Sequence, residues 1–212
     1  MFSILRASLG EAWEDSVRLL LQSSAVEVVD GRAGGPCHQI YNVVMHCTEP
    51  QREPRISKHY GFARELAKHF TFVHTNASAE AREIRTRIRS WKCGRQVIDQ
   101  LERVTELLRA SPSTQRGIIS LWNPKIDLFG PSPICPVHLH LYRAGGALSA
   151  TVTVRSGDAW MAAPLDLYAF AELQASVAND LGWEVGTYTH HVVAYHLYLH
   201  HKPIAERALV DA

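Results

Sequence analysis

The chain has 212 residues, of which 46% are hydrophobic and 20% charged, proportions typical of one globular domain with a sizeable core. Its 22 basic and 21 acidic residues give a formal net charge of +1, which excludes the large positive field that binds nucleic-acid polymers. No segment approaches the run of about 18 apolar residues that spans a membrane, and four widely spaced cysteines without a secretory signal favour reduced thiols. We therefore expect a single cytoplasmic domain over residues 1–212, with no membrane and no nucleic-acid polymer as partner.

Helical patterns dominate the first half of the chain. Apolar residues recur at helical spacing in four segments: 8–22, 57–70, 78–90 and about 97–110. The first begins with Ser8 and Glu11 at capping-box spacing, and the third is more polar, which predicts greater exposure. The glycine-containing loop at 31–39 leads into a β-branched strand at 40–47.

Strand patterns dominate the second half. Residues 117–122 predict a short buried strand, and residues 138–156 predict a hairpin with its turn at Gly145 and Gly146. A helix at 165–181 closed by Gly182 follows. The last strand lies within 189–201, and its period of two places four side chains on one face: His190, His196, Tyr198 and His200. Helices interspersed with antiparallel hairpins predict an α+β fold.

Cys135 is the first candidate for chemistry. It lies in a proline-rich loop that enters the hairpin, where a thiol is expected at the mouth of a cavity. It is either a nucleophile or, as cysteines more often are, a small core residue. At the far end of the hairpin, Arg155 and Ser156 suit a phosphate, whereas a surface ion pair between Arg155 and Asp158 is the alternative.

His196 and Tyr198 are spaced to hydrogen-bond one hydroxylated ligand. The 12 histidines also raise a metal-dependent enzyme as the second enzyme class. No HExxH or comparable motif is present, so we expect no metal.

Several segments occur in an order that matches one family. They are IDQLERVTELLRASPSTQRGIISLWNP, ICPVHLHLYRAGGALSATVTVRSGDAW, APLDLYAFAEL and HLYLHH. Together they resemble the thymidylate synthase superfamily, which includes the nucleotide hydroxymethylases, over about residues 98–201. The resemblance implies a mixed or antiparallel sheet flanked by helices, a short N-terminal part, and no counterpart of the C-terminal segment that closes over folate.

The resemblance also implies roles for individual residues. Cys135 falls on the thiol that adds to pyrimidine carbon 6, Arg155 and Ser156 on phosphate ligands, and Asp158 on a residue that contacts base and folate. His196 and Tyr198 fall on the ligands of the ribose 3′-hydroxyl.

A homodimer is likewise implied. Arg116 falls on the second of two arginines that reach the phosphate across the subunit interface, and Gln115 replaces the first. The expected ligand is a pyrimidine nucleoside monophosphate.

Asp166 distinguishes this chain from thymidylate synthases, which have asparagine at the corresponding position. An amide matches oxygen 4 and N3-H of uracil, whereas cytosine presents an amino donor and an N3 acceptor. A carboxylate accepts from the amino group and favours a proton on N3. The resemblance therefore implies CMP or dCMP as substrate, while a helix N-cap is the alternative role for Asp166.

The implied reaction is hydroxymethylation. Addition of Cys135 activates carbon 5 toward the one-carbon unit of methylenetetrahydrofolate, and water then captures the exocyclic methylene. Glu65, in FARELAKHF, is the expected carboxylate of the water relay, and an exposed helix position is its alternative. Two other functions stay open: modification of carbon 5 without folate, and nucleotide binding without turnover.

Overall fold

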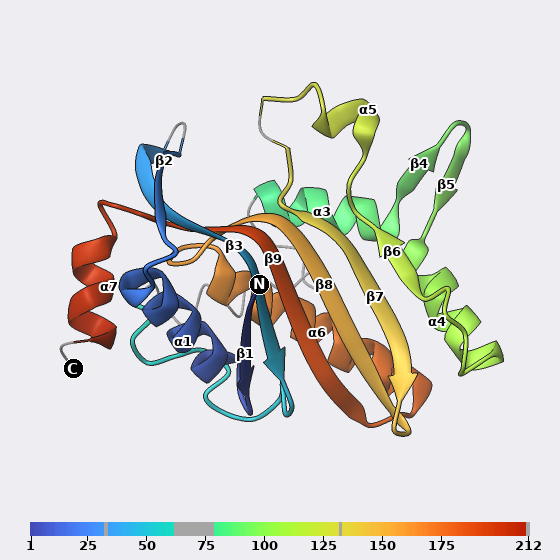
Figure 1. Ribbon diagram of the computed structural model, residues 1–212. Coiled ribbons are helices and arrows are strands. Elements are labelled where there is room, and N and C mark those ends of the chain that lie inside the picture. The colour runs from blue at the N-terminus through green and yellow to red at the C-terminus, as the bar shows by residue number, and fades with distance from the viewer. Residues whose placement is uncertain (32–33, 62–78, 132, 211–212) are drawn as a thin grey trace.

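The computed structural model describes residues 1–31, 34–61, 79–131 and 133–210. Within them a seven-stranded mixed sheet runs in the order β1-β3-β9-β8-β7-β6, and β2 pairs with β3 at one side (Figure 1). The strands are β1 (Phe2–Arg6), β2 (Glu27–Asp30), β3 (Pro36–Cys47), β6 (Ile118–Ser120), β7 (Pro136–Ala144), β8 (Ala147–Asp158) and β9 (Val185–Tyr198). The predicted α+β class with a mixed sheet flanked by helices is confirmed.

Helices cover one face of this sheet. They are α1 (Leu9–Gln22), α4 (Gln100–Ala110) and α6 (Ala163–Leu181), which contact one another through α6 and the strands beneath them. In Figure 1 no described helix lies over the face of β7, β8 and β9 that points to the viewer. The core lies between the two layers and includes Trp13, Trp160, Phe170 and Tyr195.

Local sequence signals explain several element ends. Ser8 and Glu11 form both bonds of the predicted capping box at the start of α1. Gly182 ends α6 with a φ of 69°, a left-handed conformation that glycine adopts without a steric penalty. The hairpin of β7 and β8 turns at Gly145 and Gly146, as predicted.

The remaining described elements lie around the sheet. They are α3 (Ala79–Arg89), β4 (Trp91–Cys93), β5 (Gln96–Ile98), α5 (Pro124–Asp127) and α7 (Lys202–Leu209). β4 and β5 form a separate two-stranded hairpin, and α4 begins only at Gln100, capped by Asp99, instead of at residue 97. Residues 57–61 are not helical, and the rest of the predicted helix at 57–70 lies outside the described residues.

Two strand predictions need correction. β6 is an edge strand in which Ile119 alone is buried, because only β7 pairs with it. In β9 even-numbered side chains face the core up to Val192, and odd-numbered ones face it from Tyr195 onward. The buried positions are Tyr188, His190, Val192, Tyr195 and Leu197. The change lies opposite Asn42 of β3, whose φ is 58°. The prediction that His190 shares a face with His196 is therefore wrong, and His190 belongs to the core.

Candidate active site

Strand direction brings the predicted site residues to one end of the sheet. β8 and β9 are parallel, and β7 is antiparallel to β8, so β7 begins where the other two strands end. Cys135 precedes β7, Asp158 ends β8, and Tyr198 ends β9. The register pairs Asp158 with His196, which places these two residues side by side.

Arg155 holds the loop that carries Cys135. Its Nε donates to the Ile134 carbonyl at 2.9 Å and its Nη2 to the Pro133 carbonyl at 2.6 Å. Nη2 also lies 3.9 Å from Cys135 Sγ, and the backbone N–H of Arg155 donates to the Cys135 carbonyl at 2.9 Å. The guanidinium lies 5.5 Å from the ring centroid of Trp122. These contacts fix the thiol beside a permanent positive charge.

The environment of Cys135 opposes thiolate formation in the ligand-free protein. Burial raises the pKa of Cys135 to about 11, Arg155 acts in the opposite direction, and the carboxyl groups of Asp166, Glu80 and Asp158 raise the pKa further. Cys135 is half-buried and packs against the edge of the core, with Arg155 beside its sulfur. Three carboxyl groups act electrostatically on this one thiol.

The ion-pair alternative for Arg155 and Asp158 is not realised among the described residues. Asp158 Oδ1 instead accepts from the backbone N–H groups of Trp160 at 2.9 Å and Met161 at 3.0 Å. This turn connects β8 to α6 and leaves Oδ2 without a hydrogen bond to any residue in the described ranges.

Asp166 lies in the first turn of α6 and is 7% exposed. The helix N-cap is Ala162, which makes no side-chain cap bond, so the capping alternative for Asp166 is wrong. Burial raises the pKa of Asp166 well above its ordinary value, and the nearby Glu80 carboxyl raises it further. Its carboxyl group makes no hydrogen bond within the described part of the chain.

The rings of His196 and Tyr198 meet edge to face with centroids 5.0 Å apart. Burial lowers the pKa of His196, and the Asp158 carboxylate opposes that shift, which favours a neutral imidazole able to donate or accept. The Tyr198 hydroxyl donates to the Gly31 carbonyl at 3.4 Å. A Cβ on Gly34 would come within 2.1 Å of the Tyr198 ring, so glycine is required where this loop crosses the tyrosine.

Other predicted residues are not placed in this group. Glu65 lies outside the described residues. Ser156 lies beside Ala194 in the sheet and is half-buried, without a hydrogen bond of its side chain to another described residue. Arg116 is exposed before β6, where Gly117 accepts from the N–H of Leu141 at 2.7 Å. Cys135 is six positions before Leu141 along β7, so Arg116 is about 20 Å from the thiol of its own chain.

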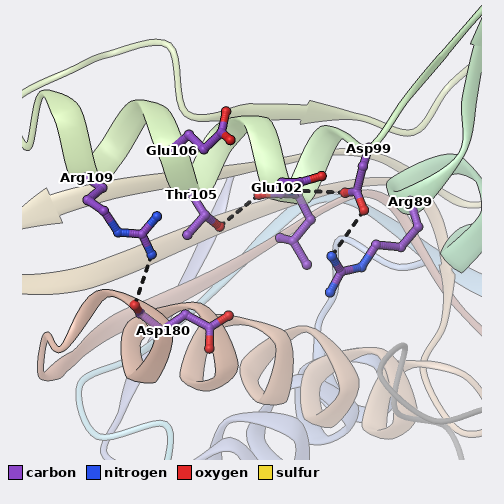
Figure 2. Close-up of a pocket in the computed structure, with 8 residues that line it drawn as sticks. Arg89, Asp99, Glu102, Thr105, Glu106, Arg109 and Asp180 are labelled. Atoms are coloured by element: carbon purple, nitrogen blue, oxygen red, sulfur yellow. Dashed lines mark hydrogen bonds and ion pairs between the residues drawn. The ribbon is translucent and has the colours of Figure 1, made fainter.

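A separate polar hollow of about 540 Å³ lies between α4 and the C-terminal part of α6 (Figure 2). Arg109 there donates to the Asp180 carbonyl at 3.1 Å, and Arg89 pairs with Asp99 at 3.3 Å. None of the predicted site residues lines it. No group of three or more potential metal ligands occurs among the described residues.

Comparison with known proteins identifies the family. The thymidylate synthase family model matches residues 51–210, which include every candidate site residue. The chain belongs to the thymidylate synthase family. It is 34% identical over 114 residues to a thymidylate synthase of Listeria monocytogenes serotype 4b, a match that covers 53% of this chain and 36% of the relative.

A second relative is also a thymidylate synthase and is matched over a similar length. A thymidylate synthase of Leuconostoc mesenteroides is 31% identical over 118 residues, covering 53% of this chain and 37% of that protein. The match thus spans little more than a third of the length of these family members. None of the described helices is both long and apolar enough to cross a membrane.

Sequence reasoning missed Glu80. It lies in the first turn of α3, and its carboxyl group influences both Cys135 and Asp166. Its segment reads as a polar, exposed helix, yet Ala81, Ile84, Arg87 and Ile88 are all buried. The i, i+3 and i+7 spacing of Ala81, Ile84 and Ile88 was the available signal.

Proposed function

We propose that this chain transfers a one-carbon unit to carbon 5 of a pyrimidine nucleoside monophosphate, with CMP or dCMP as substrate and the 5-hydroxymethyl nucleotide as product. The observation that carries this function is the buried acid Asp166 placed near the Cys135 thiol. Family membership supports the reaction type, and the acid supports the choice of base.

A protonated Asp166 is complementary to cytosine. Its O–H donates to N3, and its carbonyl oxygen accepts from the 4-amino group. If the proton moves to N3, the carboxylate still accepts hydrogen bonds from N3–H and from the 4-amino group. Both hydrogen bonds between Asp166 and cytosine therefore form with the proton on either partner. Uracil offers an acceptor at oxygen 4 and a donor at N3, so it pairs with the acid only while the proton stays on Asp166. The raised pKa of Asp166 fits a group that exchanges a proton with its ligand.

Cys135 is the proposed nucleophile. The thiolate adds to carbon 6, and the electron pair of the 5,6 double bond moves toward carbon 5, where a proton on N3 stabilises the developing negative charge. Arg155, 3.9 Å from the sulfur, stabilises the thiolate before it attacks. Its Nη1 and the Ser156 hydroxyl are the proposed phosphate ligands, and His196 and Tyr198 are the proposed ligands of the 3′-hydroxyl.

Methylenetetrahydrofolate is the proposed one-carbon donor and supplies the carbon at the oxidation level of formaldehyde. Asp158 fits it, because Oδ2 has no hydrogen bond within the described ranges and can accept from an amino-bearing heterocycle. Glu65 remains the proposed carboxylate of the water relay.

A homodimer is proposed to complete the phosphate site. With Arg116 about 20 Å from Cys135 of the same chain, it can serve only the site of a second copy. The sheet face without described helices carries alternating polar residues of β7, β8 and β9, including His138, Thr153 and His191, and offers a surface for that copy. A monodisperse monomer at micromolar concentration would contradict this assignment.

Release of tritium from 5-tritiated CMP, dCMP and dUMP tests the function. We expect release from the cytosine nucleotides that depends on methylenetetrahydrofolate and is lost in Cys135→Ser. Cys93→Ser is the matched control, because Cys93 is an exposed cysteine in the separate β4–β5 hairpin. Asp166→Asn should shift release from cytosine nucleotides to dUMP.

The other outcomes separate the alternatives. Release without folate would replace one-carbon transfer by proton exchange at carbon 5. No release from folded protein that binds the nucleotides would leave a binding function. A preference of the unmodified protein for dUMP would refute the assignment of Asp166.

A further inference from the structure

Two rows of side chains cross the sheet on the face over which no described helix lies (Figure 1). Leu139, Val152 and Val192 point into the core, so their sequence neighbours in β7, β8 and β9 point to this face. The strand register orders the first row as His138, Thr153 and His191. It orders the second row as His140, Thr151, Thr189 and His46. We call these two rows the histidine face.

The side chains of the histidine face are hydrogen-bonding groups that can serve as donor or acceptor. His138 Nε2 lies 3.4 Å from Thr153 Oγ1, and His46 Nδ1 lies 2.8 Å from Thr189 Oγ1. Nε2 of His140 is buried and has no hydrogen-bond partner among the described residues. Because a hydroxyl and a neutral imidazole can both donate and accept, this face can form hydrogen bonds with an identical face.

Acidic residues are nearly absent from the strands of this face. β1, β3, β6, β7 and β9 contain no aspartate or glutamate, and the one in β8 is its last residue, Asp158. Asp158 lies five residues beyond Thr153, or about 16 Å along the strand. Besides the histidines, the titratable or charged side chains that the described residues present to this face are Tyr142, Arg116 and Arg155. A proton taken up by a histidine here therefore has no carboxylate beside it and adds to the positive charge of two arginines.

A second copy of the chain fits this face. Neutral histidines and threonines give two identical faces no charge with which to repel each other, as a two-fold interface requires. Exposed aliphatic side chains lie at both edges of the second row, where Leu5 of β1 is 59% exposed beside His46 and Ile118 of β6 is 47% exposed beside His140.

The area of the face predicts an association of limited strength. Six strands spaced about 4.8 Å apart span about 24 Å, and β8 from Ser149 to Arg155 covers about 20 Å. Two copies would therefore cover roughly 1,000 Å² in total, which is at the lower limit for a specific interface. An association of this size is sensitive to a few added charges.

We propose that the histidine face is a pH-sensitive interface between two copies of this chain, which associate through it at neutral pH and separate when its histidines take up protons. The homodimer belongs to the proposed function, on which this inference rests, and its control by pH is the new element. Separation would also withdraw Arg116 of each copy from the site that it is proposed to complete.

The sign follows from the surroundings of the histidines. Burial lowers the pKa of His138 within one copy, and His140 and His191 lower it further. A second copy would exclude water from this face and bring the same three histidines opposite, so positive charge is disfavoured more in the dimer than in the separated copies. Protons therefore bind preferentially to the separated copies, and acidification favours separation.

Sedimentation equilibrium of the full chain at pH 7.5 and pH 5.5, at one ionic strength, measures the dissociation constant of the dimer. The test variant combines His138→Gln, His140→Gln and His191→Gln, because glutamine stays neutral and keeps hydrogen-bonding capacity. His59→Gln is the matched control, since His59 lies in the segment 57–61 and not in the sheet. Circular dichroism at both pH values checks that each protein is folded.

A histidine with the ordinary pKa of about 6.5 that stays neutral in the dimer weakens association about tenfold between these pH values, so one in each copy gives about 100-fold. We expect the dissociation constant of the unmodified protein and of His59→Gln to rise reversibly by at least about 100-fold at pH 5.5. The triple variant should change by less than about threefold, and His191→Gln alone should show a smaller rise than the unmodified protein.

Two results would overturn the pH-sensitive interface. One is a dissociation constant of the folded, unmodified protein that stays within about threefold between the two pH values. The other is a rise that persists undiminished in the triple variant and in His191→Gln. A monomer at pH 7.5 and micromolar concentration would instead refute the proposed homodimer itself.

Discussion

The reactivity of Cys135 tests the electrostatic description of the candidate site directly. With its pKa raised from 9.0 to about 11, the thiolate fraction at pH 8 falls by about 100-fold relative to an unperturbed thiol. A more basic thiolate is intrinsically more nucleophilic, and a Brønsted coefficient of about 0.45 returns about eightfold over two pKa steps. We therefore expect alkylation by iodoacetamide to be roughly tenfold slower than for an accessible, unperturbed thiol.

The pH dependence is the sharper measurement. The alkylation rate of Cys135, followed by mass spectrometry of its peptide, should rise about tenfold per pH unit through pH 9.5 without a plateau. Cys93, which is exposed, serves as an internal reference, and Cys47, whose pKa burial raises to about 12, should react more slowly still. A plateau for Cys135 below pH 9 would refute the reasoning.

The effect of Arg155→Met on the alkylation rate of Cys135 is a second test of the electrostatic description. Arg155 is the group that lowers the pKa of Cys135, so its removal should slow alkylation further. If loosening of the loop at Pro133 and Ile134 dominates instead, alkylation becomes faster. Faster alkylation in the variant would mean that Arg155 acts on this thiol mainly by holding the loop.

Three further predictions concern stability. Burial lowers the pKa of His190 to about 3, so only the unfolded chain takes up a proton on this imidazole as the pH falls below about 6.5. At pH 5 this proton uptake costs about 2 kcal/mol of unfolding free energy. In urea unfolding, His190→Leu should therefore lose less stability between pH 7 and pH 5 than the unmodified protein does. The pKa of Asp166 is raised, so the contribution of this group to stability is lost as the pH rises above about 4. Asp166→Asn should therefore be more stabilising at pH 8 than at pH 4.5 in urea unfolding. An equal effect at both pH values contradicts the raised pKa. Asp127→Ala removes the buried partner of Arg87 and leaves it paired with the more exposed Glu83, so it should cost about 3 kcal/mol in thermal or urea unfolding, whereas a cost below about 1 kcal/mol would show that the Asp127 pair is solvated.

Elements with strong local signals were predictable from the sequence. The capping box at Ser8 and the glycine at 182 set helix ends through interactions within a few residues, and both occur as expected. The hairpin at 138–156 has alternating strands around a glycine turn, so its register is also local. The convergence of Cys135 and Asp166 is not local, and the order of family motifs was the signal that predicted it.

What escaped prediction depends on contacts distant in sequence. The side of β9 that faces the core changes between Val192 and Tyr195, opposite the left-handed residue Asn42, and strand periodicity cannot reveal a change of parity. The burial of Arg87 on α3 depends on its bond to the Leu121 carbonyl, 34 residues away. A helix composed mostly of charged residues gives little indication of which side will be buried, because arginine is buried only where its partners exist.

The charges around Cys135 determine the order of proton movements in the proposed reaction. In the ligand-free protein, Asp166 in its ionised form opposes the thiolate, so ionisation of either group disfavours ionisation of the other. Cytosine offsets this opposition, because the carboxylate formed when N3 accepts the Asp166 proton is paired with a cationic base, and that base attracts the thiolate toward carbon 6. Uracil has no acceptor at N3 and cannot do the same. Selection of cytosine and activation of the thiol are thus one event, and Asp166→Asn should lose both with cytosine nucleotides while Arg155 continues to hold the loop.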